Sequence, residues 1–197
     1  MYKYRKLTAK QKAEIVQQRL ANGYPPHSPP HHLTDYEFYL LTAACYEHKC
    51  RLNSQPRRQQ ILNLLWENFI EIDISILAWV VLPNHYHLLV KNVDFKQVSK
   101  TLKLIHGRLA RQWNLEDNLT GKVWHSYSDR GIRSERHYYA TINYIHYNPV
   151  KHGHVNSPYD WQESSVHWYL KYEGRDWLRS CWVDYPLGDY GKGWDDI

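Results

Sequence analysis

The chain has 197 residues, enough for one domain with extensions, and its net charge of +5 and pI of about 9.0 favour an acidic partner, nucleic acid first. It contains 17 Tyr and 9 Trp but only 3 Phe; such rings stack well on unpaired bases, although each alone fits an amphipathic core equally well. The odd number of cysteines, with no C-x-x-C pair, argues against a disulfide framework and a zinc knuckle. The sequence shows no apolar leader and no apolar run long enough to span a membrane. We therefore expect a reduced, cytoplasmic protein with no membrane partner.

The N-terminal stretch is predicted to be a basic helix followed by a linker. Thr8 and Gln11 have the spacing of a capping box at the start of a helix over 8–22. Residues 25–32 hold four prolines and three histidines, which favours an extended, solvated segment. We therefore expect residues 1–33 to form an N-terminal extension.

The rest of the chain alternates between strand and helix patterns. Period-two and period-3.6 spacing predict, in order, a strand over 36–46, a helix over 56–71, a hairpin of strands 74–82 and 85–91, a helix over 95–113, a short strand or two within 123–133, a helix over 135–148 ended by Pro149, and a small helix over 162–173. This order predicts an α+β, ferredoxin-like (split βαβ) fold, an antiparallel sheet with helices packed on one face. The hairpin strands are expected to be central, within a catalytic domain over 34–168 that precedes an aromatic-rich extension over 169–197.

The hairpin carries the first candidate site. His85 and His87 are two residues apart on one predicted strand, so their side chains share a face about 6.6 Å apart along it. Two imidazoles on one face can hold one metal ion, or can be polar residues hydrogen-bonded on a sheet.

The helix before Pro149 supplies the complementary groups. Tyr144 and Asn148 lie one helical turn apart, on the same face. Two imidazoles and an amide oxygen leave open positions on an octahedral ion and suit Mg²⁺ or Mn²⁺ acting as a Lewis acid. Tyr144 would then present its hydroxyl beside that ion as a nucleophile toward a phosphodiester. Spacing alone does not select Tyr144 over the other tyrosines of this helix, and Tyr147 is a candidate substitute nucleophile.

Three stretches carry a family resemblance. Residues 82–90, L-P-N-H-Y-H-L-L-V, resemble the HUH (His–hydrophobic–His) signature of single-tyrosine transposases. Residues 144–153, Y-I-H-Y-N-P-V-K-H-G, resemble the Y-I-x-x-N-P-V-[KR]-x-G motif of the REP-associated tyrosine transposases, relatives of the IS200/IS605 transposases. Residues 123–130 resemble their W-Q-x-x-x-x-[DE] stretch, with His125 in place of Gln. The resemblance spans about residues 34–168.

The resemblance implies an HUH endonuclease that cuts single-stranded DNA with a divalent metal ion. Its metal ligands map onto His85, His87 and Asn148, and its nucleophile onto Tyr144. The implied product is a 5′-phosphotyrosine with a free 3′-hydroxyl, and the implied substrate is a short hairpin with adjacent guide bases. Residues 4–6, Tyr4, Arg5 and Lys6, are similar to the family's Y-R-[RK] segment, which reads the foot of the hairpin; a plain basic N-terminus is the alternative.

A cationic helix face offers further contacts to this DNA. Four side chains of the predicted 95–113 helix are candidate phosphate ligands: Lys100, Lys103, Arg108 and Arg111. The expected protein is thus a DNA transposase, a monomer or a homodimer. The alternatives are a domesticated protein that binds hairpin DNA without cutting it and, last, a histidine-based metallohydrolase acting on small substrates, which would need a carboxylate base that neither motif supplies.

Overall fold

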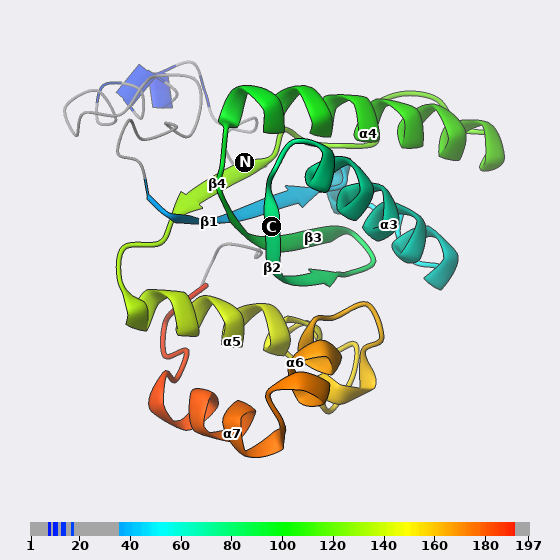
Figure 1. The fold of residues 1–197 in the computed structure, drawn as a ribbon. Helices are drawn as coiled ribbons and strands as arrows, with labels where there is room; N and C mark the ends of the chain where they lie inside the picture. Colours follow the sequence, from blue (N-terminus) through cyan, green and yellow to red (C-terminus); the bar gives the residue numbers. More distant parts are fainter. Residues whose placement is uncertain (1–7, 9, 12, 15–16, 18–35, 192–197) are drawn as a thin grey trace. The chain divides into compact units, whose positions relative to one another are not determined.

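The computed structural model describes residues 8, 10–11, 13–14, 17 and 36–191 (Figure 1). The chain divides into two units, Met1–Asp35 with Gly191–Ile197, and Tyr36–Tyr190. In the first, the described residues from Lys10 to Gln17 are helical, and Thr8 and Gln11 exchange reciprocal backbone and side-chain hydrogen bonds, which confirms the predicted capping box. The linker over 25–32 and the segment 4–6 lie outside the described residues.

The second unit is built on a four-stranded antiparallel sheet in the order β2-β3-β1-β4. The strands are β1 (Phe38–Ala44), β2 (Ser75–Val81), β3 (His85–Lys91) and β4 (Ser128–Gly131). This order confirms the ferredoxin-like prediction and places β3 and β1 at the centre. The other hairpin strand, β2, is not central as expected but lies at the edge of the sheet, where residues 161–165 cover it: Ser164 bridges Val80, and the indole N–H of Trp161 donates to the Val81 carbonyl.

One layer of helices covers the first face of the sheet. It consists of α3 (Gln55–Glu71) and α4 (Phe95–Glu116) (Figure 1). Alternate residues of the central strands, such as Leu41 and Leu88, point into this layer and pack with Ile61, Leu65 and Leu109. The result is a continuous hydrophobic core under these two helices.

A second layer covers the opposite face. It consists of α5 (Glu135–Lys151), α6 (Val166–Tyr172) and α7 (Arg175–Asp184), with a short 3₁₀ turn at Pro158–Asp160 (Figure 1). The prediction that helices cover one face alone is wrong, because α5, α6 and α7 cover the other face. Ser134 caps α5 by accepting the backbone N–H of His137, as predicted. The helix α7 was not predicted. No helix within the described residues is long and apolar enough to cross a membrane.

The prediction that Pro149 ends the tyrosine helix is wrong, because α5 continues to Lys151. A proline removes one backbone donor, yet here it is buried and only two residues before the last residue of the helix, so few bonds depend on it. The carbonyl of Asn148 still accepts the N–H of His152, and Gly153, with a φ of 70°, closes the helix as His154 donates to the Pro149 carbonyl.

Candidate active site on the second face of the sheet

The histidine pair lies on β3, on the face that α5 covers. His85 and His87 are 4% and 1% exposed, and their ring centroids are 4.9 Å apart. The strand begins at His85, directly after the Pro83-Asn84 turn. Tyr86, between the two, points into the opposite layer, where its hydroxyl oxygen lies 2.9 Å from the Nε2 atom of His106. The alternation of one strand therefore sends both imidazoles to the same side.

Each histidine is held by its Nδ1 atom. His85 Nδ1 donates to the Asn84 amide oxygen at 2.6 Å, and His87 Nδ1 lies 2.7 Å from the hydroxyl oxygen of Thr42 on the neighbouring strand. A partner on Nδ1 fixes the ring orientation and leaves Nε2 as the atom that faces α5, as second-sphere groups do in metal sites.

The helix α5 brings the other two predicted residues to these Nε2 atoms. The Tyr144 hydroxyl oxygen is 3.3 Å from His87 Nε2, and the Asn148 amide oxygen is 3.2 Å from His85 Nε2. Tyr144 and Asn148 are buried. Residues 57 or more positions apart in the chain thus form one constellation, because one turn of α5 spans the spacing of alternate residues on β3.

The donor set fits a divalent cation. Nδ1 of His85 donates to Asn84, so a neutral ring would direct its Nε2 lone pair toward the oxygen of Asn148 and toward a cation between the two atoms. Ligands in adjacent positions of an octahedral ion at about 2.1 Å are about 3 Å apart, close to the 3.2 Å separation of these two atoms. The buried Nδ2 atom of Asn148 has no hydrogen-bond partner among the described residues. In the same part of the chain, no three His, Cys, Asp or Glu side chains gather in a metal-binding group, so the amide is what completes the pair.

Tertiary packing distinguishes Tyr144 from its neighbours. Tyr147 packs against Trp182, 5.2 Å between ring centroids, and Tyr139 stacks on Tyr185 at 4.7 Å. Tyr138 packs on a ring of β1, at the other end of the helix. Of the four tyrosines in α5, Tyr144 is the one whose hydroxyl reaches the histidine pair.

Three further side chains surround the Tyr144 ring. The ammonium nitrogen of Lys151 lies 5.2 Å from the ring centroid, and the ring of Tyr190 lies 5.6 Å away. Arg130 on β4 interacts electrostatically with the phenols of Tyr190 and Tyr144; burial lowers the pKa of the guanidinium, and the two phenols oppose that effect. Sequence reasoning missed these roles. Lys151 and Arg130 lie within the motif stretches and were open to recognition there, whereas no local pattern singles out Tyr190.

Three other histidines near the motifs are not part of the constellation of His85, His87, Tyr144 and Asn148. His146 is fully buried, and burial lowers its pKa to about 3, which keeps it neutral beside the Ser165 hydroxyl at 3.0 Å. His125, in the position of the family's Gln, is buried and accepts the backbone N–H of Glu47. His152, one turn beyond Asn148, places its ring 5.1 Å from that of His85 and so borders the site.

The predicted phosphate contacts are not part of this constellation. All four cationic side chains are exposed on α4, in the layer that covers the opposite face of the sheet: Lys100, Lys103, Arg108 and Arg111. The other predicted contacts, Tyr4, Arg5 and Lys6, lie outside the described residues.

Comparisons with known proteins find similar sequences and a similar fold. Residues 33–148 match the family described as "Transposase IS200 like", a span that contains all four converging residues. The chain is 30% identical over 128 residues to the REP-associated tyrosine transposase of Escherichia coli (strain K12), covering 59% of this chain and 73% of that protein. Its fold resembles a solved REP-associated tyrosine transposase bound to a REP hairpin, with a TM-score of 0.59 and 23% identity over 74% of this chain and 88% of the other.

Proposed function

The chain belongs to the family of IS200-like transposases, as a relative of the REP-associated tyrosine transposases, and on that premise we propose that it cuts and rejoins single-stranded DNA beside a hairpin, with Tyr144 as the nucleophile. The observation that carries this proposal is the 3.3 Å separation of the Tyr144 hydroxyl from His87 Nε2, beside the His85–Asn148 contact. The Tyr144 hydroxyl and the three candidate ligands are buried together where α5 covers β3.

The proposed metal ligands are His85, His87 and Asn148, with Mg²⁺ or Mn²⁺ as the ion. When bound there, the ion would neutralise a nonbridging oxygen of the scissile phosphate and orient that phosphate. Thr42 and Asn84 hold the two imidazoles so that their Nε2 lone pairs point to the same place.

Tyr144 then forms the covalent link. Its oxygen bonds to phosphorus while the bond to the 3′-oxygen of the preceding nucleotide breaks, which leaves a 5′-phosphotyrosine and a free 3′-hydroxyl. A phenol has a pKa near 10 in water and is a weak nucleophile at neutral pH. The positive charges of Lys151 and Arg130 beside the ring favour the phenolate form that attacks.

Rejoining is the same step in reverse. A phosphotyrosine replaces one phosphodiester with another of similar energy, so attack by a 3′-hydroxyl transfers the strand without a nucleotide cofactor. The buried position of Tyr144 protects the link from water. This chemistry suits transposition, in which a strand is released from one place and joined at another.

The proposed substrate is hairpin DNA of the REP kind. The solved structure with this fold holds a REP hairpin, and the E. coli relative is named for association with such elements. The basic balance and the exposed cations of α4 suit the same polyanion.

The test is a denaturing gel after incubation with hairpin DNA that carries single-stranded flanks, in Mg²⁺ or Mn²⁺. We expect a detergent-stable protein–DNA adduct with the wild type and none with Tyr144→Phe. Tyr147→Phe is the matched control, because it removes a hydroxyl from the same helix, and it should form the adduct normally. An adduct that persists in Tyr144→Phe and disappears in Tyr147→Phe would overturn the assignment; tight hairpin binding without any adduct would support the non-cleaving alternative.

A further inference from the structure

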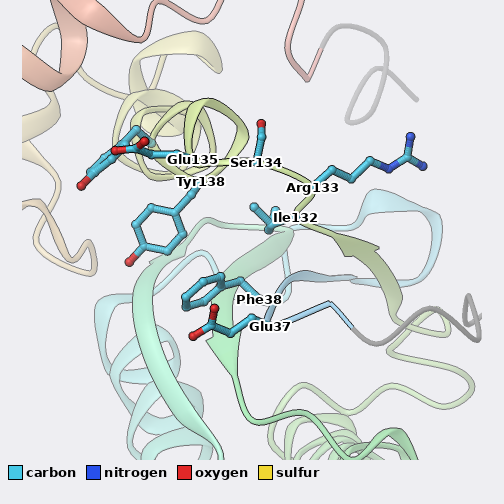
Figure 2. A pocket seen from close by; sticks show the side chains of 8 residues that line it. Glu37, Phe38, Ile132, Arg133, Ser134, Glu135 and Tyr138 are labelled. Carbon is cyan, nitrogen blue, oxygen red and sulfur yellow. The ribbon is translucent and has the colours of Figure 1, made fainter.

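A pocket of about 390 Å³ lies at the end of β1 and α5 away from the histidine pair (Figure 2). This volume is within the range of small-molecule sites. Its lining comes from the start of β1, the residues after β4 and the first turns of α5: Glu37, Phe38, Ile132, Arg133, Ser134, Glu135, Tyr138 and Tyr139. None of the roles assigned above uses this pocket.

Two aromatic rings form one wall of the pocket. Phe38 and Tyr138 are half-buried and lie 4.9 Å apart between ring centroids, with an interplanar angle of 58°. Figure 2 shows the two rings beside each other, with the Arg133 side chain directed away from them. The Lys91 ammonium nitrogen lies 5.6 Å from the Phe38 ring centroid, so the ring on which a flat aromatic ligand would stack is that of Tyr138.

Carboxylates beside the rings add a preference for hydrogen-bond donors. Glu37 lies next to the Phe38 ring in Figure 2 and accepts one ion-pair contact, at 2.9 Å, from Lys91. A carboxylate has about four acceptor positions, so this contact leaves others for the amino group of a base. Adenine, cytosine and guanine carry such a group, and thymine does not.

The pocket and the nucleophile lie on the same face of the sheet. Phe38 and Thr42 are four residues apart on β1, about 13 Å along the strand. Tyr138 and Tyr144 are six residues apart on α5, about 9 Å along the helix. Arg130 lies between the two places, because it pairs with Leu40 at the middle of β1. A few nucleotides of an unpaired strand can span these distances, because such a strand covers at least the roughly 3.4 Å per nucleotide of a stacked one.

We infer that this pocket holds one unpaired base of the DNA strand whose scissile phosphate lies at Tyr144, a few nucleotides away, with Arg130 on an intervening phosphate. The inference rests on the proposed function and extends it, since it assigns base selection to β1 and the start of α5 rather than to the N-terminal segment. The base is one that carries an exocyclic amino group.

The test measures binding of hairpin DNA in which a single abasic site is moved along both single-stranded flanks. The Tyr144→Phe protein is used so that the strand stays intact. We expect binding to fall about tenfold at one position, because stacking on an aromatic side chain contributes about that factor per base. Tyr138→Ala should cause a loss of similar size with intact DNA and no further loss when the abasic site is at that position.

Two other variants complete the experiment. Tyr172→Ala, a matched change at an exposed tyrosine of α6 outside the pocket, should leave the abasic profile unchanged. Glu37→Gln should reduce the discrimination against thymine at the sensitive position and nowhere else.

A flat abasic profile, or equal weakening by Tyr138→Ala at every position, overturns the inference even if the adduct forms. A wild type that neither binds hairpin DNA nor forms the adduct overturns the proposed function instead. The abasic profile alone does not say which part of the protein holds the base, so Glu37→Gln decides the location if Tyr138→Ala misfolds: unchanged discrimination against thymine in Glu37→Gln then overturns the inference.

Discussion

Strand β3 has two buried faces with opposite chemistry. On one face, Tyr86, Leu88 and Val90 enter the hydrophobic core under α3 and α4. On the other, His85 and His87 meet Tyr144 and Asn148 beneath α5, with each imidazole contacted at both nitrogens. The side chains on both faces of β3 are buried, so the two faces differ in the side chains that the covering helices place against them. The apolar face stabilises the fold, whereas the face with the two imidazoles is the one on which we propose the chemistry.

The sharpest test of this comparison changes adjacent residues of β3. His87→Ala should lower the rate of adduct formation by about 10³-fold, because a Lewis acid contributes several kcal/mol to such a reaction. Leu88→Ala should lower the free energy of unfolding by about 2–5 kcal/mol through the cavity it leaves. Adduct kinetics and urea unfolding measure the two effects. If Leu88→Ala slows the chemistry of the folded protein as much as His87→Ala does, the two faces are not functionally distinct.

A smaller effect is expected from Thr42, which contacts the proposed metal ligand His87. Thr42→Val removes the hydroxyl 2.7 Å from His87 Nδ1 and should lower metal affinity about 10- to 100-fold, as loss of a second-sphere partner typically does. The measurement is the Mg²⁺ or Mn²⁺ concentration that gives half-maximal adduct formation. Thr101→Val, at a buried threonine of α4 on the core side, is the control and should leave that concentration unchanged. An equal shift in both variants would point to general destabilisation.

Each helical layer also contains a buried histidine that responds to acid. Burial lowers the pKa of His106 on α4 to about 4 and that of His146 on α5 to about 3, from 6.5. The unfolded chain therefore binds more protons below pH 6.5, so stability is complete above that value and declines as the pH falls toward 4. The loss is about 1.4 kcal/mol per pH unit for each group.

Urea unfolding at pH 7 and pH 5.5 measures this loss. His146→Gln should reduce the pH dependence of the free energy of unfolding, because it removes one of the two buried groups that resist protonation. An unchanged pH dependence in His146→Gln would contradict the assignment of a neutral, structural role to this histidine.

The smallest effect is expected from the α4 cations. Lys100→Ala should weaken binding of all hairpin sequences by a similar, few-fold factor and reduce the slope of log K against log salt by about one unit. Lys171→Ala, on α6 in the other layer, provides the comparison. A change in sequence preference, or a salt slope that does not move, would remove α4 from the DNA-binding surface.

Local periodicity was sufficient to predict most elements of the fold. The strand β3, the helix α4 and the Ser134 cap follow from spacing and capping chemistry, because these depend on neighbours within a turn or a strand. The extent of α5 past Pro149 and the existence of α7 did not follow, since burial against distant residues decided both.

The site shows the same division. The sequence by itself determined that His85 shares a face with His87 and that Tyr144 shares one with Asn148, because the periods of strand and helix are properties of the backbone. Only the tertiary structure decided that these two faces meet, that Tyr144 rather than Tyr147 reaches the imidazoles, and that Arg130 and Lys151 border the ring. The packing of one element on another depends on contacts between residues far apart in the chain, and no local pattern contains that information.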